Sequence, residues 1–408
     1  MSNSSYDIVI VGGGSAGSAL AASVKKRAPS LTIAIIEPSD KHYYQPAWTL
    51  VGAGEFDVNK TVRPMAQAIP DGVTWLKAAV TEFQPTEKKV ITDTLGTIQY
   101  TQLVVAAGLR LNWEGIKGLT ETLGKNGVTS NYRVDLAPYT WQLVQQLQSG
   151  EAIFTQPPMP IKCAGAPQKA LYLSCAEWLG KGRLGHIKAS FYSATPALFS
   201  VKEYVAPLMQ YIRRYKVNLN LNSTMVEVDG PGKTAWFNVK DADGNVQRIS
   251  KPFDLLHVVP PQTALDFLKK SPLANADGWV EVDQHSLQHV RYPEVFGVGD
   301  CTSTPNAKTA AAARKQVVIA AENILAQREG KALLSRYDGY GSCPLTVEKG
   351  KIILAEFGYG GKIVPTFPWD STKPRRSAWL LKKYVLPWLY WNLMLKGREW
   401  LARCGACG

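Results

Sequence analysis

The segment YDIVIVGGGSAGSALAASVKKR at residues 6–27 joins an apolar run to a glycine-rich turn and a helical pattern, and this combination indicates the type of domain. Residues 8–11 predict a buried strand, and residues 18–26 predict a helix. Between them, three glycines satisfy the pattern G-x-G-x-x-G: Gly12, Gly14 and Gly17. The first makes a tight turn, the second admits a pyrophosphate and the third allows close helix–strand packing. The helix N-terminus then faces the phosphates with free N–H groups, so this unit predicts a dinucleotide site.

A second apolar run, at residues 31–36, predicts the neighbouring strand of the same unit. It ends in Glu37, 20 residues after Gly17, where an acid binds the ribose hydroxyls of an adenosine. A distant stretch favours FAD over NAD as the ligand. Residues 294–302, EVFGVGDCT, predict a strand that leads into Asp300 and a helix start, the usual arrangement at the ribityl and pyrophosphate end of FAD.

A third stretch, LVVAAG at residues 103–108, predicts a further strand and a turn at Gly108, where a chain typically leaves an FAD domain. These three segments are spread over about 300 residues. We therefore expect the FAD domain to be assembled from discontinuous parts of the chain.

Length and composition limit the class of protein. The 408 residues suffice for two or three domains, and 45% are hydrophobic, which indicates a globular protein with a sizeable core. No run of about 18 uncharged apolar residues predicts a spanning helix, and no charged region or cleavage site predicts a signal peptide. Six cysteines are too few for a disulfide scaffold, so cysteine chemistry is expected to be local.

The net charge of +13 indicates an anionic partner, and the distribution of the charge along the chain indicates which kind of partner it is. Residues 373–408 hold eight basic residues and one acid, so seven of the thirteen net positive charges lie in the tail. The tail also carries four tryptophans, and its apolar run at 384–395 is too short to span a bilayer and contains Pro387. Aromatic and basic residues on short amphipathic helices predict an interfacial anchor on an anionic membrane surface, with no nucleic acid as partner. A buried C-terminal helix or a dimer contact is the alternative.

Residues 112–250 predict a second dinucleotide-like domain, but this region has no second G-x-G-x-x-G motif. The predicted strands are residues 151–155, 186–192, 217–221 and 234–239. The loop after the first, QPPMPIKCAGAPQKA at 156–170, has Gly165 as its one glycine, and its prolines lack the N–H donors that a phosphate cradle needs. The missing cradle disfavours an NADH-oxidising enzyme.

Several unusual stretches then give the chain a family resemblance. They are HYYQPAWTLVGAG (42–54), KCAGAPQKALYLS (162–174), RYPEVFGVGDCT (291–302), KTAAA (308–312), YDGYGSCPL (337–345), ILAEFGY (353–359) and LPWLYWNLMLKG (386–397). Over nearly its whole length the chain resembles the sulfide:quinone oxidoreductases, in the branch with the mitochondrial enzymes and their bacterial relatives. The resemblance implies an FAD enzyme that oxidises sulfide at a redox pair, Cys163 and Cys343, and reduces a membrane quinone.

The resemblance also implies a fold, a division of the chain and a set of cofactor contacts. The fold is α/β, with two Rossmann-like domains of the glutathione-reductase kind and a C-terminal membrane-associating helical tail. The expected parts are residues 1–111 (FAD domain, first part), 112–252 (second Rossmann-like domain with Cys163), 253–330 (FAD domain, second part) and 331–408 (redox and quinone segment with the anchor). The residues that the resemblance adds to the FAD site are Ser15, Ala16, Gln45, Val80 and Lys308, beside Gly12, Gly14, Gly17, Glu37, Gly108 and Asp300.

The residues around Cys163 suit sulfide chemistry. A disulfide offers an electrophilic sulfur to hydrosulfide, and a low thiol pKa makes the departing sulfur a better leaving group. Lys162 and Lys169 flank Cys163, and a helix is predicted to begin near Gly165; both features lower a thiol pKa. The resemblance gives the persulfide to Cys343. Phe357 is a candidate contact for the quinone ring or a core residue.

The other cysteines and the histidines indicate no metal site. Cys175 lies in an apolar helical pattern and Cys301 follows Asp300, so both are expected to be inert. Cys404 and Cys407 form half a zinc motif in a solvated tail, and the five histidines lack metal-ligand spacing.

Several alternatives stay open at this stage. The sulfur acceptor is a small molecule such as glutathione, sulfite, coenzyme A or polysulfide, and a homo-oligomer is possible. The expected location is peripheral and monotopic on a bacterial inner membrane. The rival functions are a type II NADH:quinone oxidoreductase, the flavin subunit of a sulfide dehydrogenase, and a non-enzymatic basic binding protein.

Overall fold

The first glycine-rich unit lies at the centre of a seven-stranded sheet. The computed structural model describes residues 4–400 and 402. The strand order is β5 (Thr74–Leu76), β2 (Ile33–Ile36), β1 (Ser4–Val11), β8 (Gly96–Val105), β7 (Lys89–Thr92) and β6 (Val80–Gln84), and β19 (Val295–Gly297) also pairs with β8. β1, β2, β5, β8 and β19 are parallel, whereas β6 and β7 pair antiparallel. Strand β19 pairs with β8 although it follows β8 by almost 200 residues in the chain. The first sheet is therefore assembled from distant parts of the sequence.

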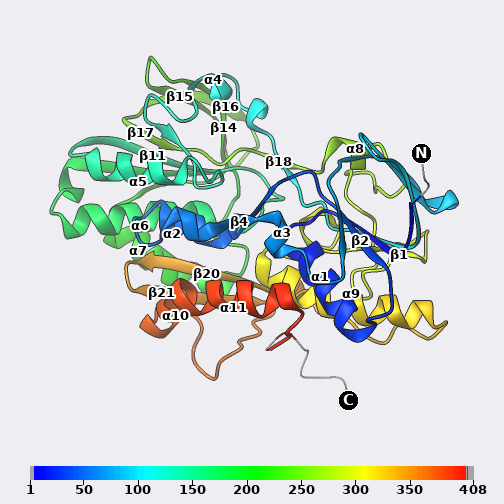
Figure 1. Ribbon diagram of the computed structural model, residues 1–408. Helices are drawn as coiled ribbons and strands as arrows, with labels where there is room; N and C mark the ends of the chain where they lie inside the picture. The colour runs from blue at the N-terminus through cyan, green and yellow to red at the C-terminus, as the bar shows by residue number, and fades with distance from the viewer. Residues whose placement is uncertain (1–3, 401, 403–408) are drawn as a thin grey trace.

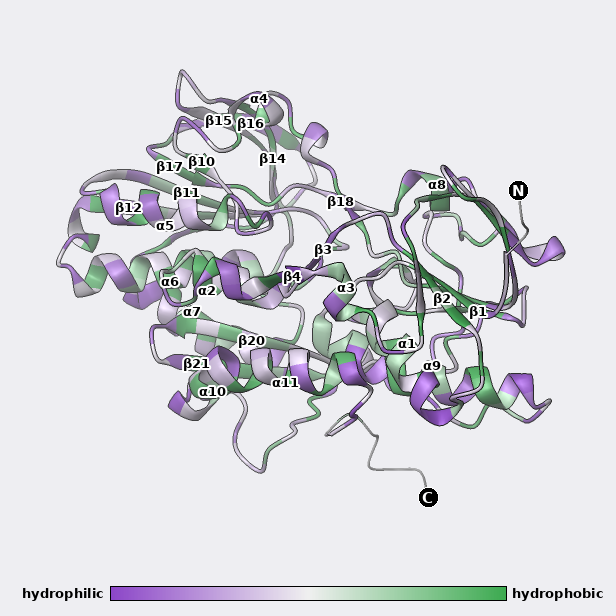
Figure 2. Ribbon diagram, in the orientation of Figure 1, coloured by the Kyte–Doolittle hydropathy of each residue, from purple (hydrophilic) through white to green (hydrophobic). Residues whose placement is uncertain are grey.

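Two helices pack side by side on this sheet: α1 (Ser15–Arg27) and α9 (Ala310–Arg328). Their inner faces share one core with β1, in which Ile8, Leu20 and Ile324 are fully buried. Figure 2 shows the central strands β1 and β2 in the hydrophobic colour, as expected of strands covered on both faces. Helix α1 begins three residues before the predicted start, because Gly14 already occupies the N-cap position.

The second sheet has five parallel strands. Their order is β10 (Val128–Thr129), β17 (Leu255–His257), β11 (Gly150–Gln156), β12 (Ile187–Ser193) and β13 (Asn218–Asn220). The helices of this part are α5 (Ala137–Gln146), α6 (Ala166–Gly180) and α7 (Val205–Arg214) (Figure 1). Both Rossmann-like sheets of the predicted fold are therefore present.

The fourth strand predicted for this region belongs to a separate antiparallel sheet. That sheet consists of β14 (Ser223–Asp229), β15 (Thr234–Lys240) and β16 (Val246–Pro252). Burial alternates along β15, as it does when one face of an antiparallel strand meets solvent. The remaining short elements are β3 (Lys41–Tyr43), β4 (Val62–Pro64), β9 (Arg110–Leu111), β18 (Gln262–Thr263), α2 (Trp48–Val51), α3 (Met65–Ala68), α4 (Leu119–Thr122) and α8 (Asp266–Lys269). The exact division at 111, 252 and 330 stays a prediction.

The C-terminal part consists of a hairpin followed by helices. Strands β20 (Gly341–Glu348) and β21 (Lys351–Phe357) form the hairpin; β20 packs against α6, and β21 packs against α10 (Arg376–Leu380). A π-helical turn, Leu381–Val385, links α10 to α11 (Leu386–Asn392), which lies below the gap between the two sheets in Figure 1. Within residues 4–400, no helix combines the length and apolarity needed to cross a membrane.

The tail is more deeply packed than its sequence predicts. Leu389, Tyr390 and Trp391 of α11 are buried in the core of the first domain, whereas Trp388 is 55% exposed. The alternative of a buried C-terminal helix therefore holds for one face of the tail. Cys404 and Cys407 lie outside the described residues.

Candidate functional site

Cys163 occupies a strained turn between β11 and α6. Its φ of 52° lies in the left-handed region, which non-glycine residues seldom adopt and which is concentrated at functional sites. The turn is held by backbone bonds, since the N–H of Cys163 donates to the carbonyl of Lys308 at 2.8 Å. The Tyr132 hydroxyl donates to the carbonyl of Lys162 at 2.9 Å. The first bond ties the cysteine loop to the segment that precedes α9, and the second ties it to the segment that follows β10 (Val128–Thr129).

Cys343, on β20, lies directly opposite, with its Sγ 3.5 Å from that of Cys163. The two residues are 180 positions apart in sequence, and both are free thiols here. A disulfide bond is about 2.0 Å long, so a movement of about 1.5 Å would join the sulfurs. Gly165 permits this approach, because a Cβ added there would lie 2.5 Å from the Cys343 sulfur.

The charge of the pair resides on Cys163. Its pKa is well below the usual value, because the Cys343 thiol donates a hydrogen bond to it and the Lys169 ammonium lies 3.2 Å from its sulfur. The pKa of Cys343 is raised by that same hydrogen bond and by burial. Only one of the two flanking lysines contacts the sulfur, since Lys162 donates instead to the Gln45 side chain at 2.5 Å.

A third lysine, Lys382, was not identified from the sequence. It is 5% exposed, and its Nζ donates to the hydroxyls of Thr346 at 2.9 Å and Thr49 at 3.3 Å. Burial and the charge of Lys169 lower its pKa well below the usual value, while the two cysteines partly oppose that effect. No local sequence pattern distinguishes Lys382 from the other basic residues of the tail, so a role near the cysteines could not be predicted.

The three glycines of the first turn have different surroundings. Gly12 has a φ of 106°, and a Cβ there would lie 2.5 Å from the Ala106 carbonyl oxygen. A Cβ on Gly17 would lie 1.9 Å from the Gly12 oxygen, so helix and strand pack as closely as the motif requires. Gly14, by contrast, faces open space, and no side chain caps α1 there. The N-terminus of α1 is therefore free to receive a phosphate.

The two acids predicted for the cofactor site, Glu37 and Asp300, both border this turn. Glu37 accepts the N–H groups of Gly13 and Ser39, each at 2.8 Å. The Asp300 turn lies beside α1, because a Cβ on Gly299 would come 3.1 Å from that of Ala16. Burial raises the pKa of Asp300, and its carboxylate has no hydrogen-bond partner among the side chains and backbone groups described. An open phosphate end and an available carboxylate together fit an FAD molecule.

The other predicted cofactor residues surround the same region with less direct roles. Lys308 donates to the carbonyl oxygens of Asp300 at 2.8 Å and Thr302 at 2.9 Å, so its ammonium supports the Asp300 turn. A role for Lys308 beside the flavin ring stays a prediction. Gly108 has a φ of 75° and open space at its Cβ position, whereas Val80 is buried in the sheet core.

A hydrogen-bonded chain links the tail to the glycine turn. The Tyr390 hydroxyl lies 2.7 Å from Ser15 Oγ and 2.5 Å from His42 Nε2. His42 Nδ1 in turn lies 3.0 Å from the Gly13 carbonyl oxygen. Burial lowers the pKa of His42 to about 4, so the imidazole is neutral at physiological pH. His42 begins one of the stretches that carry the family resemblance, residues 42–54, but the sequence did not connect it to the tail.

The remaining candidates are structural. Cys175 is fully buried, which raises its pKa, and Cys301 is buried with its sulfur 3.3 Å from the Val105 carbonyl oxygen. Burial also raises the pKa of Cys301 to about 11. Phe357 packs edge-on against Phe199 in the core beneath the hairpin, which favours the core alternative. In the described part of the chain, no cluster of His, Cys, Asp and Glu side chains could hold a metal ion.

Comparison with known proteins agrees with this architecture. The family model described as pyridine nucleotide-disulphide oxidoreductase matches residues 6–156. The mitochondrial sulfide:quinone oxidoreductase of Mus musculus is 41% identical, over 96% of this chain and 87% of the relative. That of Dictyostelium discoideum is 44% identical, over 96% and 86%. The crystal structure of the sulfide:quinone oxidoreductase of Aquifex aeolicus superposes with a TM-score of 0.78 at 18% identity, covering 97% of this chain and 92% of that one, and supports the fold.

These relatives correct one expectation. The predicted location on a bacterial inner membrane is wrong, because the matching curated relatives are named mitochondrial and come from eukaryotes. The resemblance covered the mitochondrial enzymes together with their bacterial relatives, so by itself it could not distinguish the two locations.

Proposed function

Because this chain belongs to the sulfide:quinone oxidoreductase family, we propose that it oxidises sulfide at the Cys163–Cys343 pair and passes two electrons through FAD to a quinone. The observation that carries the proposal is the 3.5 Å approach of the two sulfurs, with the Lys169 ammonium 3.2 Å from Cys163. A buried cation beside one member of a thiol pair makes that member the better leaving group.

The sulfur steps follow from this asymmetry. Hydrosulfide attacks Cys343 Sγ in the oxidised pair, a new S–S bond forms there, and the bond to Cys163 breaks. Cys163 leaves as a thiolate stabilised by Lys169, and Cys343 carries the persulfide. A small nucleophile, such as glutathione, sulfite, coenzyme A or polysulfide, then takes the outer sulfur and leaves Cys343 as a thiolate. Loss of two electrons from the two thiolates restores the disulfide.

FAD, when bound, supplies the acceptor for those two electrons, and a quinone is its oxidant. The residues that would hold it are the glycine turn, Glu37 at the adenosine ribose and Asp300 at the ribityl end. The hydrogen bonds of Lys308 to the carbonyl groups of Asp300 and Thr302 hold the Asp300 turn in place. We also propose that the exposed face of the tail rests on an anionic membrane surface, where a quinone is available.

Anaerobic addition of sulfide together with sulfite, one of the proposed sulfur acceptors, to the FAD-loaded protein tests the proposal. We expect the yellow flavin absorbance to bleach, and a short-chain quinone to restore it. Cys163→Ser and Cys343→Ser should each abolish bleaching, whereas Cys175→Ser, a matched change at a buried thiol outside the site, should leave it intact. Normal bleaching in both site variants would refute the assignment of the pair.

A further inference from the structure

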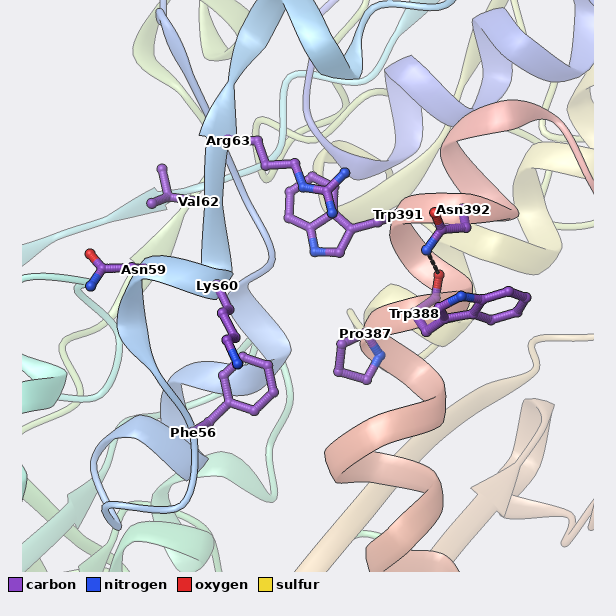
Figure 3. A pocket seen from close by; sticks show the side chains of 9 residues that line it. All are labelled: Phe56, Asn59, Lys60, Val62, Arg63, Pro387, Trp388, Trp391 and Asn392. Carbon is purple, nitrogen blue, oxygen red and sulfur yellow. Dashed lines mark hydrogen bonds between the residues drawn. The ribbon is translucent and has the colours of Figure 1, made fainter.

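A groove of about 280 Å³ lies between residues 56–63 and helix α11 (Figure 3). Its apolar part includes the side chains of Phe56, Pro387 and Trp391, and Trp388 lies at its edge. Lys60 and Arg63 line the wall formed by residues 56–63, together with Phe56, and this segment is more than 300 residues away from the tail in sequence. The groove thus combines an apolar surface with two cations.

The charge of the groove is not neutralised by the protein. Lys60 and Arg63 are both exposed, and neither makes an ion pair with any carboxylate in the described part of the chain. The Arg63 guanidinium is held 4.2 Å above the Trp391 ring, which fixes its position at the groove. No acidic residue lines the groove. Two cations beside an apolar wall suit an anionic amphiphile, whereas a neutral quinone ring needs no such charge.

The groove continues into an exposed apolar stripe on the tail. Leu380, Tyr384 and Trp388 follow one another at four-residue intervals through α10, the π-helical turn and α11, and are 54%, 59% and 55% exposed. Residues at this spacing lie on one side of a helix, so the stripe leads to the edge of the groove at Trp388. A ligand with a phosphate in the groove could therefore lay its acyl chains along the stripe.

We infer that the groove binds the phosphodiester headgroup of an anionic phospholipid between Lys60 and Arg63, with the acyl chains on the Leu380–Tyr384–Trp388 stripe. The inference rests on the proposed docking of the tail at a membrane and adds a specific headgroup site formed by another part of the chain. Arg63 offers a planar set of donors to a phosphate, and Lys60 offers a point charge. The two charges of this site lie outside the tail, although the net positive charge of the chain is concentrated in the tail.

The test is co-sedimentation of the full-length, FAD-loaded protein with phosphatidylcholine vesicles, with and without phosphatidylglycerol. We expect Lys60→Ala/Arg63→Ala to lower the partition coefficient on the phosphatidylglycerol vesicles by about 30-fold, since each basic residue at an anionic surface contributes about fivefold. Lys60→Arg, which keeps the charge and leaves Arg63 stacked on Trp391, should bind like the wild type. The matched control Lys181→Ala/Arg213→Ala removes the same two charges from exposed positions outside the groove and should have little effect.

Two results would overturn the inference. One is equal binding of the wild type and the Lys60→Ala/Arg63→Ala variant to phosphatidylglycerol vesicles. The other is unchanged vesicle binding together with a raised KM for a short-chain quinone in detergent, which would assign the groove to the quinone. Sulfide bleaching, measured on the same samples in detergent, separates the two proposals, because it tests the redox pair without any vesicle.

Discussion

Replacement of Lys169 by methionine tests the electrostatic origin of the Cys163 thiolate. The Lys169 side chain is 3% exposed, and its Nζ lies 3.2 Å from the sulfur. Methionine keeps the length and the apolar contacts of the side chain but removes the positive charge and the hydrogen bond. We expect the pKa of Cys163 to rise, so that its thiolate forms only at a higher pH than in the wild type.

The size of the effect follows from the contact. A hydrogen bond to a charged group contributes about 1.5–3 kcal/mol. Loss of that stabilisation lowers the thiolate population, at a pH where the thiol predominates, by about 10- to 150-fold. The rate of alkylation by iodoacetamide should fall by the same factor, because the thiolate is the nucleophile. Lys382 remains in the variant, so some of the positive field at the sulfur is retained.

The assay is the pH dependence of Cys163 alkylation in the reduced protein, followed by mass spectrometry of the modified peptide. Lys162→Met is the matched comparison, because Lys162 precedes Cys163 in sequence but donates to Gln45. It should change the alkylation rate much less than Lys169→Met. Equal rates in the wild type and Lys169→Met would show that the lysine does not set the charge of the pair.

Three further predictions concern the tail and its contacts. Lys382→Met should slow alkylation of Cys163 less than Lys169→Met does, because Lys382 bonds two threonine hydroxyls and acts on the sulfur only through its charge; the same titration measures it. Tyr390→Phe should lower the free energy of unfolding by about 1–3 kcal/mol, since it leaves His42 Nε2 buried without its partner; urea unfolding measures the loss. Stability should fall as the pH drops from 6.5 to about 4, because the unfolded chain protonates His42 and His257 while the folded chain keeps both neutral. The loss of unfolding free energy approaches about 3 kcal/mol for each histidine. Thermal unfolding measured across that pH range checks the prediction, and the His42→Gln variant should show a smaller loss.

The cofactor half of the protein was predictable because its signals are local. The glycine turn, the following helix and Glu37 lie within 32 consecutive residues, and each has a fixed place in a strand–turn–helix unit. The place of β19 in the FAD domain was also predictable from the sequence, since a strand that ends in Gly-Asp before a helix is a recognisable pattern. The strand at 234–239 was predicted, but its place in a separate antiparallel sheet was not, because a short apolar run does not reveal whether its neighbour is parallel or antiparallel.

The redox half was not predictable from spacing, because its parts meet only in the folded chain. Cys163 and Cys343 were paired by resemblance, and the packing of α6 against β20 is what brings their sulfurs together. The positive charge of Lys162 was expected at the sulfur, but its side chain turns towards Gln45. Charge counting included Lys382 among the basic residues of the predicted membrane anchor, whereas the structure buries it near the cysteines.

The packing of Lys382 changes the meaning of the tail. Along one continuous helical segment, Trp379 and Lys382 point into the protein, while Leu380, Tyr384 and Trp388 are exposed. The same helix therefore places a buried lysine near the redox pair with one face and an apolar stripe at the surface with the other. Further along, Tyr390 reaches the glycine turn through Ser15 and His42. An anchor that merely tethered the enzyme would need neither contact. A tail that is displaced from the body should consequently weaken the thiolate and the cofactor turn together, even when the tail is away from any membrane.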